Sequence, residues 1–178
     1  MTNPWLVPVT GLRRSSLGAV KEERRSGQVG ELRVADSMVE ASAEATAAAV
    51  LTAIDGGIEV AADVDAPWVG ECRRCLKPLT GELRCQVREL FRPRTPSESA
   101  DEDDETYPLA GEQLDLRPLV RDALLLELPL APLCRRDCRG LCPTCGADLN
   151  EGDCACPKAD TDPRWAALDA LREQSSNQ

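Results

Sequence analysis

The feature that most constrains the fold of this chain is the spacing of its nine cysteines, because eight of them occur as four close pairs. Zinc is held in proteins by four ligands in a tetrahedron, and cysteine thiolates are among its preferred donors. Two cysteines in one tight turn can reach the same ion, so four pairs predict two four-cysteine zinc sites. The pairs are Cys72 and Cys75, Cys134 and Cys138, Cys142 and Cys145, and Cys154 and Cys156.

The most specific of these motifs is Cys142-Pro143-Thr144-Cys145-Gly146. Proline fixes φ before the turn, and glycine after the second cysteine permits a positive φ, so backbone N–H groups can point at the sulfurs. This knuckle is expected to pair with Cys154 and Cys156. The other site would then join Cys72 and Cys75 to Cys134 and Cys138, across about 60 residues, and would couple metal binding strongly to folding.

Three alternatives remain open at the level of sequence. A single zinc could be held by Cys134, Cys138, Cys142 and Cys145, which would leave Cys72 and Cys75 free or redox-active. The chain could hold no metal. An iron–sulfur cluster uses the same ligands, so metal binding is better supported than the identity of the metal. The remaining cysteine, Cys85, lies in an alternating strand pattern and is expected to be a small core residue.

Composition excludes several functions. The chain has no histidine, which removes the Ser-His-Asp and Cys-His systems and every histidine-containing metal site. The common phosphate-binding glycine loops are absent from the sequence. No export signal and no long apolar stretch is recognisable, so we expect a cytoplasmic chain with reduced thiols and no membrane span. The net charge of −10 argues, taken alone, against binding to nucleic acid.

The first half of the chain is predicted to be rich in strands. Residues 1–35 are polar and basic, and we expect an arm with a short strand near Trp5–Val9. The alanine-rich segment 37–54 favours a helix by propensity, but the turn residues Asp55-Gly56-Gly57 and the alternating segment 58–64 favour a hairpin of two antiparallel strands. Residues 79–91 are predicted to form a half-buried strand.

An antiparallel β-rich domain is expected over 36–133, and it includes an acidic loop over residues 95–112. Residues 115–128 are predicted to form a helix, with Asp115 as its cap and Pro118 in its first turn. The last division, 134–178, is expected to hold the zinc-knuckle segment and a helix over 162–173.

Four motifs in this order carry a family resemblance. They are ECRRCLKPL at 71–79, LDLRPLVRDALLLELPLAPLC at 114–134, DCRGLCPTCGADLNEGDCAC at 137–156 and DPRWAALDAL at 162–171. At these motifs the sequence resembles the bacterial YceD family, named for accumulation of the large ribosomal RNA subunit.

The resemblance implies an α+β fold with a mainly antiparallel β first half, one central helix, a cysteine-rich zinc-knuckle segment and a C-terminal helix. It also implies a role in the accumulation of large-subunit (23S) rRNA, and hence in ribosome biogenesis. Family members have no established catalytic residues, so a non-enzymatic factor is expected.

Basic residues near the cysteines are the candidate RNA-binding groups. They are Arg73, Arg74 and Lys77 beside the first pair, and Arg135, Arg136 and Arg139 among the later cysteines. The expected pairing of cysteines would bring these two groups together. A positive face on a negative molecule can bind the phosphates of large-subunit rRNA or of a pre-ribosomal particle. These residues could equally be a solvated face that offsets the negative charge of zinc–thiolate sites.

Two other functions compete with RNA binding. One is a zinc-dependent adaptor that binds a ribosomal protein or an assembly enzyme. The other is a thiol oxidoreductase that uses Cys72-Arg73-Arg74-Cys75, because flanking arginines lower the pKa of a thiol. The oxidoreductase is disfavoured because no βαβ pattern surrounds the motif.

Overall fold

The structure is a computed structural model that describes residues 3–93, 106–109 and 111–157. The chain divides into two units, Met1–Cys138 and Arg139–Gln178, here called the sheet unit and the C-terminal unit. The sheet unit is built mainly from antiparallel strands, with few helices, which confirms the expected α+β class. The helix expected over 162–173 lies outside the described residues.

The sheet unit contains all the helices and strands that the described residues form. In chain order these are β1 (Leu6–Pro8), α1 (Thr10–Arg14), β2 (Val20–Gln28), β3 (Leu32–Val34), β4 (Ser37–Val39), β5 (Glu44–Ile54), β6 (Gly57–Glu71), β7 (Pro78–Pro93), β8 (Tyr107–Leu109), β9 (Gln113–Asp115) and α2 (Arg117–Glu127). No helix among the described residues has both the length and the apolar character that a membrane crossing needs.

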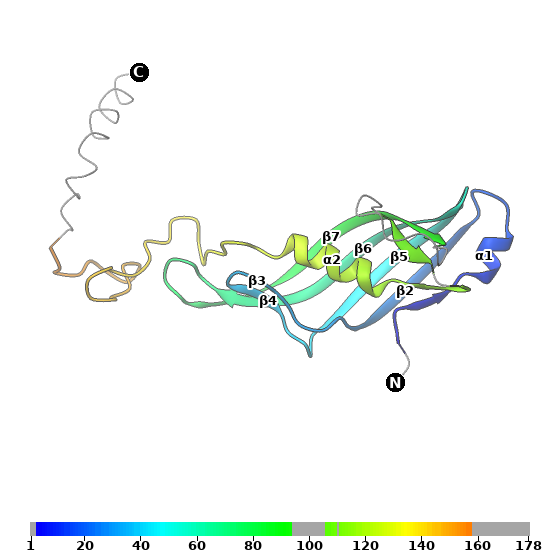
Figure 1. The fold of residues 1–178 in the computed structure, drawn as a ribbon. Helices are drawn as coiled ribbons and strands as arrows, with labels where there is room; N and C mark the ends of the chain where they lie inside the picture. Colours follow the sequence, from blue (N-terminus) through cyan, green and yellow to red (C-terminus); the bar gives the residue numbers. More distant parts are fainter. Residues whose placement is uncertain (1–2, 94–105, 110, 158–178) are drawn as a thin grey trace, which may run out of the picture. The chain divides into compact units, whose positions relative to one another are not determined.

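The long strand β6 organises the main sheet (Figure 1). Along one edge it pairs antiparallel with β7, from Ile58 to Glu71. Along the other edge its first half pairs with β5 and its end pairs with β4. Strand β2 extends the sheet beyond β5, β3 extends it beyond β4, and β8 adds to β7 in parallel. Strands β1 and β9 form a separate antiparallel pair.

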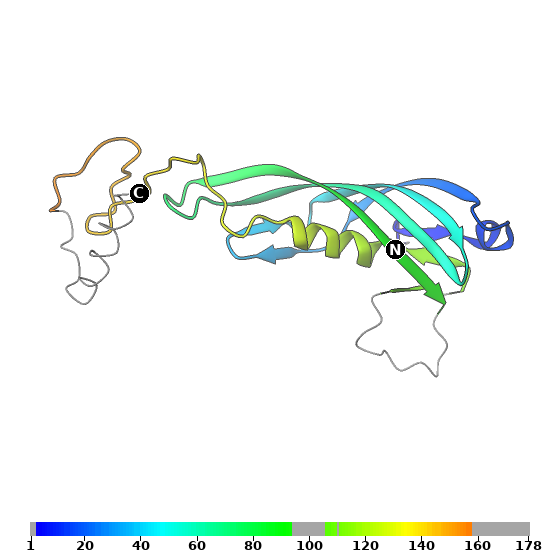
Figure 2. The same cartoon turned by 90° about the horizontal axis from the view of Figure 1, so that it is seen from above.

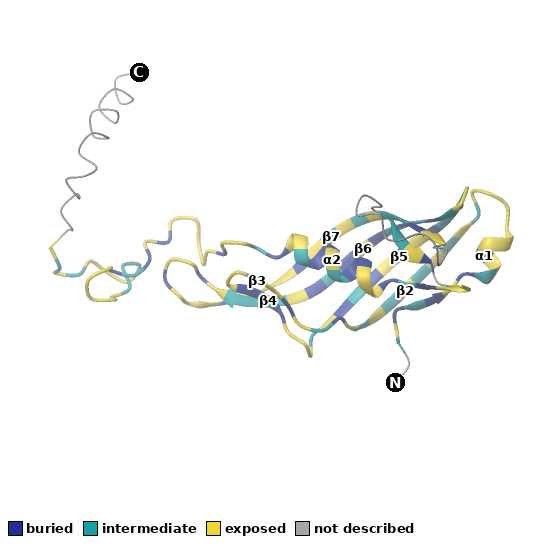
Figure 3. Cartoon of the chain, viewed as in Figure 1, coloured by how far each residue is buried: buried dark blue, intermediate teal, exposed yellow. Residues whose placement is uncertain are grey.

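The alanine-rich segment is a strand, as the hairpin interpretation predicted. Every second residue of β5 is buried, from Ala45 to Ala53, and β6 alternates in the same way (Figure 3). The two strands are joined by Asp55-Gly56, and Gly56 has a φ of +74°, which a glycine adopts without strain. Tertiary pairing therefore overrides the helix propensity of alanine, because the buried face is already the face of a sheet.

Helix α2 covers one face of the sheet, as Figure 2 shows. The cap position is Leu116, one residue after the expected Asp115, and it has no side-chain cap bond. The Asp115 carboxylate nevertheless accepts a hydrogen bond of 2.9 Å from the N–H of Arg117, and Pro118 lies in the first turn. Buried residues Leu119, Val120, Ala123 and Leu124 form the inner stripe. The predicted helix is confirmed, and its end leads directly into the segment that carries Cys134 and Cys138.

The N-terminal residues differ from the expected basic arm. The short strand near Trp5–Val9 is confirmed as β1, but Val20–Gln28 pairs along its whole length with β5. Its charged side chains do not prevent this, because the ladder is made by backbone groups and the charges pair with each other. Glu23 accepts from Lys21 at 2.8 Å and from Arg25 at 2.9 Å.

Two expected boundaries also change. Residues Tyr107–Leu109, expected within the acidic loop, form β8 beside β7, while residues 94–105 lie outside the described part. The cysteine-rich division was expected to begin at residue 134, but Cys134 and Cys138 belong to the sheet unit. The reason is that their side chains lie against Cys72 and Cys75 of the same unit.

Candidate metal centres

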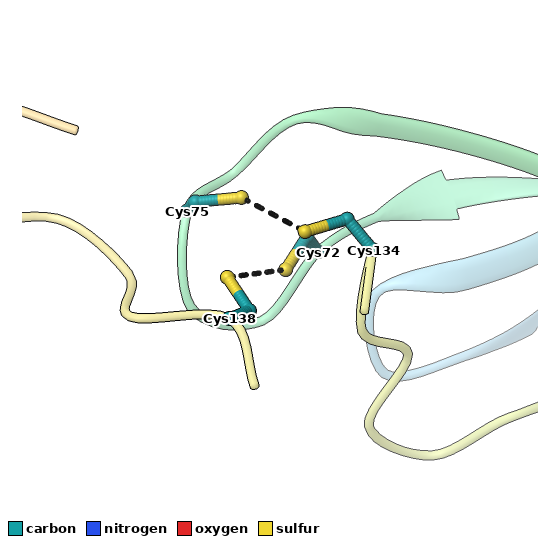
Figure 4. A group of neighbouring side chains, drawn as sticks. All are labelled: Cys72, Cys75, Cys134 and Cys138. Atoms are coloured by element: carbon teal, nitrogen blue, oxygen red, sulfur yellow. Dashed lines mark hydrogen bonds between the residues drawn. The ribbon is translucent and has the colours of Figure 1, made fainter. Parts of the chain in front are cut away.

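The first cysteine group lies where the β6–β7 hairpin turns. Figure 4 shows the side chains of Cys72, Cys75, Cys134 and Cys138 pointing toward one another, and all four sulfurs lie within 4.8 Å of each other. The Sγ atoms of Cys72 and Cys138 are 3.7 Å apart, and those of Cys75 and Cys134 are 3.6 Å apart. A tetrahedron with Zn–S bonds of about 2.3 Å has sulfurs about 3.8 Å apart. The separations therefore fit one shared ion and are too long for a disulfide.

A tight turn holds the first two cysteines. The N–H of Leu76 donates to the carbonyl of Cys72, and the N–H of Cys72 donates to the carbonyl of Lys77, both at 2.8 Å. Leu76 has a φ of +59°, in the left-handed region that a leucine seldom adopts. This conformation turns the chain so that both sulfurs face the same point.

The segment that carries Cys134 and Cys138 is held to this turn by two hydrogen bonds between protein groups. The N–H of Arg73 donates to the carbonyl of Pro132 at 2.9 Å. The guanidinium Nη1 of Arg74 donates to the carbonyl of Cys138 at 2.8 Å. The segment after α2 is therefore fixed against the hairpin by protein groups, and the four thiols are brought together by the fold itself.

Ionisation in the first group is uneven. Burial opposes the thiolate of Cys72, but backbone N–H groups of Cys134, Cys75 and Arg74 outweigh it and lower its pKa to about 6. The neighbouring Cys138 thiol, together with burial, raises the pKa of Cys134 to about 12. The fold thus favours the thiolate of Cys72 and opposes that of Cys134, and a bound cation would favour the thiolate form of all four.

The second cysteine group lies in the C-terminal unit and consists of Cys142, Cys145, Cys154 and Cys156. These four sulfurs also lie within 4.8 Å of one another. The N–H of Gly146 donates to the carbonyl of Cys142 at 2.9 Å, and the N–H of Cys142 donates to the carbonyl of Ala147 at 2.8 Å. Gly146 has a φ of +73°. This turn repeats, bond for bond, the turn at Cys72–Lys77.

Backbone groups also favour one thiolate in the second group. The N–H groups of Cys145 and Thr144, helped by the Cys154 thiol, lower the pKa of Cys142 to about 6. The Cys145 thiol, together with burial, raises the pKa of Cys156 to about 12. In both groups, backbone N–H groups thus lower the pKa of the first cysteine of the C-x-x-C turn.

The ninth cysteine belongs to neither group. Cys85 is half-buried in β7, its thiol lies 3.7 Å from the carbonyl oxygen of Val64, and burial raises its pKa. The left-handed conformation of Leu76 was not predicted from the sequence, although Leu76 follows its C-x-x-C motif just as Gly146 follows the other one. The hydrogen bond from the N–H of Arg73 to the carbonyl of Pro132 was not predicted either, because no sequence pattern indicates it.

The candidate RNA-binding residues are divided between the two units. Arg73, Arg74, Lys77, Arg135 and Arg136 are exposed in the two segments that the first cysteine group joins, while Arg139 belongs to the C-terminal unit. Arg74 is engaged with Cys138, and Arg135 lies 3.5 Å from Asp137. Arg139 forms an ion pair with Asp153.

An α+β sheet with a four-cysteine group at its hairpin turn, followed by a second group in a separate knuckle, defines a protein with two candidate metal centres. Comparison with known proteins agrees with this class. The sequence model of the family "Large ribosomal RNA subunit accumulation protein YceD" matches residues 60–172, which is more than half of the chain. The chain therefore belongs to the YceD family.

Several curated relatives are similar to this chain. An uncharacterized protein of Mycobacterium tuberculosis is 41% identical over 116 residues, which are 65% of this chain and 56% of that protein. The chloroplastic "Large ribosomal RNA subunit accumulation protein YCED homolog 1" of Arabidopsis thaliana is 34% identical over 73 residues, 41% of this chain and 23% of that protein. The uncharacterized protein YlbN of Bacillus subtilis is 30% identical over 107 residues, 58% of this chain and 59% of that protein.

The chain spans little more than half the length of the mycobacterial relative that it matches. No solved structure matches this chain.

Proposed function

We propose that the chain binds two zinc ions, one in each four-cysteine group. The support is geometric and chemical, since each group offers four sulfur donors within 4.8 Å and zinc prefers such a tetrahedral set. A four-iron cluster would place each cysteine on a different iron and would need its sulfurs further apart. A single ion therefore fits the spacing better. The zinc would hold the turns in place rather than carry out a reaction.

We further propose that the chain is a non-enzymatic factor in the accumulation of large-subunit (23S) rRNA, acting in the cytoplasm. The family's printed description supports the biological role. The observation that carries the molecular part is the first cysteine group, which joins the turn holding Arg73 and Arg74 to the segment holding Arg135 and Arg136. Two basic sequences that are about 60 residues apart thereby come to one place on an otherwise acidic protein.

The side chains at this place have different tasks in the proposal. Within the described residues, Arg73 and Arg136 are exposed and form no ion pair or side-chain hydrogen bond, so their guanidinium groups are available to phosphates. Arg74 is partly occupied by the carbonyl of Cys138. We therefore assign the main phosphate contacts to Arg73 and Arg136, with Lys77 and Arg135 in support, and a structural contribution to Arg74. Arg139 is proposed to contact RNA from the C-terminal unit.

The test is the salt dependence of binding to a large-subunit rRNA fragment. Each phosphate contact adds about 0.7–0.9 to the slope of log affinity against log salt. The variant Arg73→Gln with Arg136→Gln should lower this slope by about 1.5 and weaken binding at low salt. The matched control, Arg84→Gln with Arg88→Gln, removes the same charge from exposed residues of β7 and should leave the slope unchanged.

Zinc content must be unchanged in both variants for the comparison to hold. An Arg73 and Arg136 variant that binds rRNA with the wild-type slope would refute the phosphate surface. In cells, ultraviolet crosslinking of the tagged chain should enrich large-subunit precursor over mature rRNA, and absence of that enrichment would count against direct RNA binding.

A second candidate function is a zinc-dependent adaptor for a ribosomal protein or an assembly enzyme. It is favoured by the exposed leucines of the segment leading to the first cysteine group, where Leu126 is 89% exposed and Leu130 is 66% exposed. Protein binding that survives nuclease treatment would support this candidate. The oxidoreductase alternative is weaker, because Cys72 and Cys75 are only half of a four-thiol group.

A further inference from the structure

Strand β7, at the border of the main sheet, leaves most of one edge open (Figure 1). Strand β8 pairs with it at Phe91–Pro93, and in the described part of the chain residues 79–90 have strand partners on the β6 side alone. An open edge presents backbone N–H and C=O groups that can pair with a further strand. Proline, lysine and bulges commonly prevent such pairing, and residues 79–90 contain none of them.

The edge strand on the other side of the sheet, β2, is protected by charge. Charged side chains lie on both of its faces, at residues 21–25. The core-facing side of β7, in contrast, has no charged residue before Glu89, because it consists of Leu79, Gly81, Leu83, Cys85 and Val87. A further strand could therefore continue this side of the sheet at β7 without burying a charge, which is not possible at β2.

An exposed leucine of α2 lies beside the open edge. Helix α2 packs against β7, and Glu127 lies close enough to Cys85 for its charge, after burial, to raise the pKa of that thiol. The preceding residue, Leu126, is 89% exposed. It follows Asp122 by one helical turn, and the Asp122 carboxylate accepts a hydrogen bond from the Tyr107 hydroxyl of β8. This side of α2 therefore faces the edge at which β8 pairs, which is also the open edge of β7.

The sequence of β7 is complementary to itself when two copies run antiparallel. A two-fold axis through such a pair places one residue opposite its own copy. With Cys85 at this position, Glu82 lies opposite Arg88 twice, and both side chains are exposed. Leu83 lies opposite Val87 twice on the core-facing side. Opposite charges and apolar pairs in these positions stabilise a sheet.

The neighbouring registers are less favourable. An axis at Gln86 would place Arg84 opposite Arg88 twice, and an axis at Arg84 would place the two copies of Arg84 opposite each other. Like charges directly opposite in a sheet are destabilising. The charges therefore favour the register centred on Cys85 over those next to it.

We propose that two copies of this chain associate through the open edges of β7, with residues 82–88 of each copy forming an antiparallel ladder centred on Cys85. The dimer joins the two main sheets and brings a second subunit up to the exposed Leu126. Because the strands run antiparallel, the two Pro78 residues, at the β6–β7 turns, lie about 50 Å apart. Each copy thus keeps its own first cysteine group at a separate end. The inference goes beyond the proposed function and requires neither metal nor RNA.

The test is sedimentation equilibrium of the zinc-loaded full chain over a range of concentrations. The wild type should show a monomer–dimer equilibrium. Glu82→Arg or Arg88→Glu alone places like charges opposite each other twice and should weaken the dimer by about tenfold or more. The double variant, Glu82→Arg with Arg88→Glu, restores opposite charges across the interface and should recover most of the lost affinity. Arg24→Glu makes the same charge change at an exposed residue of β2 and should leave the dimer unchanged.

The double variant separates pairing between copies from effects within one chain. Arg88 also contacts Glu59 of its own chain, and exchanging the charges of residues 82 and 88 does not restore that contact. Recovery is therefore expected only if the two residues meet across a dimer. A double variant no better than the single ones would overturn the proposed register, and a wild type that is monomeric at every concentration would overturn the dimer.

Hydrogen exchange of the wild type gives a second measurement that does not depend on the variants. Amides in residues 79–90 should become more protected as the protein concentration rises, because outward-facing N–H groups gain partners. Amides of β2 should show no such change. Protection that rises with concentration elsewhere, and not in residues 79–90, would show that the copies meet through another surface. Should a charge variant not fold, this measurement decides.

Discussion

The two cysteine groups use the same turn but are supported in opposite ways. In the first group, Cys72, Cys75 and Cys138 are buried, and the thiol pairs that meet are 66 and 59 residues apart in sequence. This group is attached to a sheet with its own apolar core. In the C-terminal unit, the described residues that are buried are only Gly140 and Cys142. Among the residues of this unit that the structure describes, the second group therefore has almost no core around it.

This difference teaches that similar ligand sets can have different structural roles. At the first group, bonds from Arg73 and Arg74 already position the ligands, so an ion there would close a long loop on a fold that forms by itself. At the second group, where the described residues offer little apolar packing, the ion would hold the segment together, as in small metal domains that are unfolded without metal. Loss of metal should therefore unfold residues 139–157 of the C-terminal unit, whereas in the sheet unit it should only lower the free energy of unfolding.

The largest effect is expected from removing the second group. Cys142→Ser with Cys145→Ser should lower the zinc content from two per chain to one. The main-chain amides of residues 139–157 should then exchange within about tenfold of an unfolded chain, because little else holds them. Hydrogen exchange measured by mass spectrometry would show this, with the sheet unit unchanged. Retained protection in 139–157 would contradict the dependence of this unit on metal.

Removing the first group should have the next largest effect. Cys72→Ser with Cys75→Ser should also reduce the zinc content to one, while β5, β6 and β7 remain folded through their own core. Opening a loop of about 60 residues should lower the free energy of unfolding of the sheet unit by about 4 kcal/mol. Urea unfolding followed by circular dichroism measures this.

Cys85→Ala serves as the control for both cysteine experiments. It removes a thiol that belongs to neither group and should leave two zinc ions bound. A measured content of one zinc in the wild type, unaltered by Cys72→Ser with Cys75→Ser, would mean that the first group holds no metal.

A smaller effect separates the side chain of Arg74 from that of Arg73. Arg74→Ala removes a charged donor from the carbonyl of Cys138, and it should weaken zinc at the first group by about tenfold. Arg73→Ala should leave zinc retention unchanged, because Arg73 holds Pro132 through its backbone N–H. Competition with a chromogenic chelator measures both variants. Equal retention of zinc in the two would show that the Arg74 bond does not support the site.

The smallest effect compares the residue that follows each C-x-x-C motif. Gly146→Ala places a side chain at a φ of +73° and should destabilise the second group by about 1 kcal/mol. Leu76→Gly relieves the same strain at the first group and should stabilise it by about 0.5 kcal/mol, since Leu76 is 58% exposed and loses little packing. Gly152→Ala, with ordinary φ and open space around its Cβ, is the matched control. The zinc affinity of all three variants checks this prediction, and it should fall in Gly146→Ala and rise in Leu76→Gly.

The chain by itself determined those parts of the structure that depend on local spacing. The cysteine pairs, the glycine after Cys145, the hairpin turn at Asp55-Gly56 and the apolar stripe of α2 all express short-range geometry, and each was predictable from neighbouring residues. The pairing of cysteines into two groups was also favoured by sequence, because the 142–156 segment is long enough to close on itself and leaves the other four together.

Only the tertiary structure decided what those local patterns join. It placed Val20–Gln28 in the sheet, because a polar strand pairs through its backbone when a partner edge is offered. It placed Cys134 and Cys138 in the sheet unit. Arg73 and Arg74, about 60 positions earlier in the chain, donate hydrogen bonds to the carbonyls of Pro132 and Cys138. It also brought Leu76 into a left-handed conformation that its own preference opposes. Apart from the paired cysteines, these long-range contacts carry no mark in the sequence around either partner, so they appear only when the chain is folded.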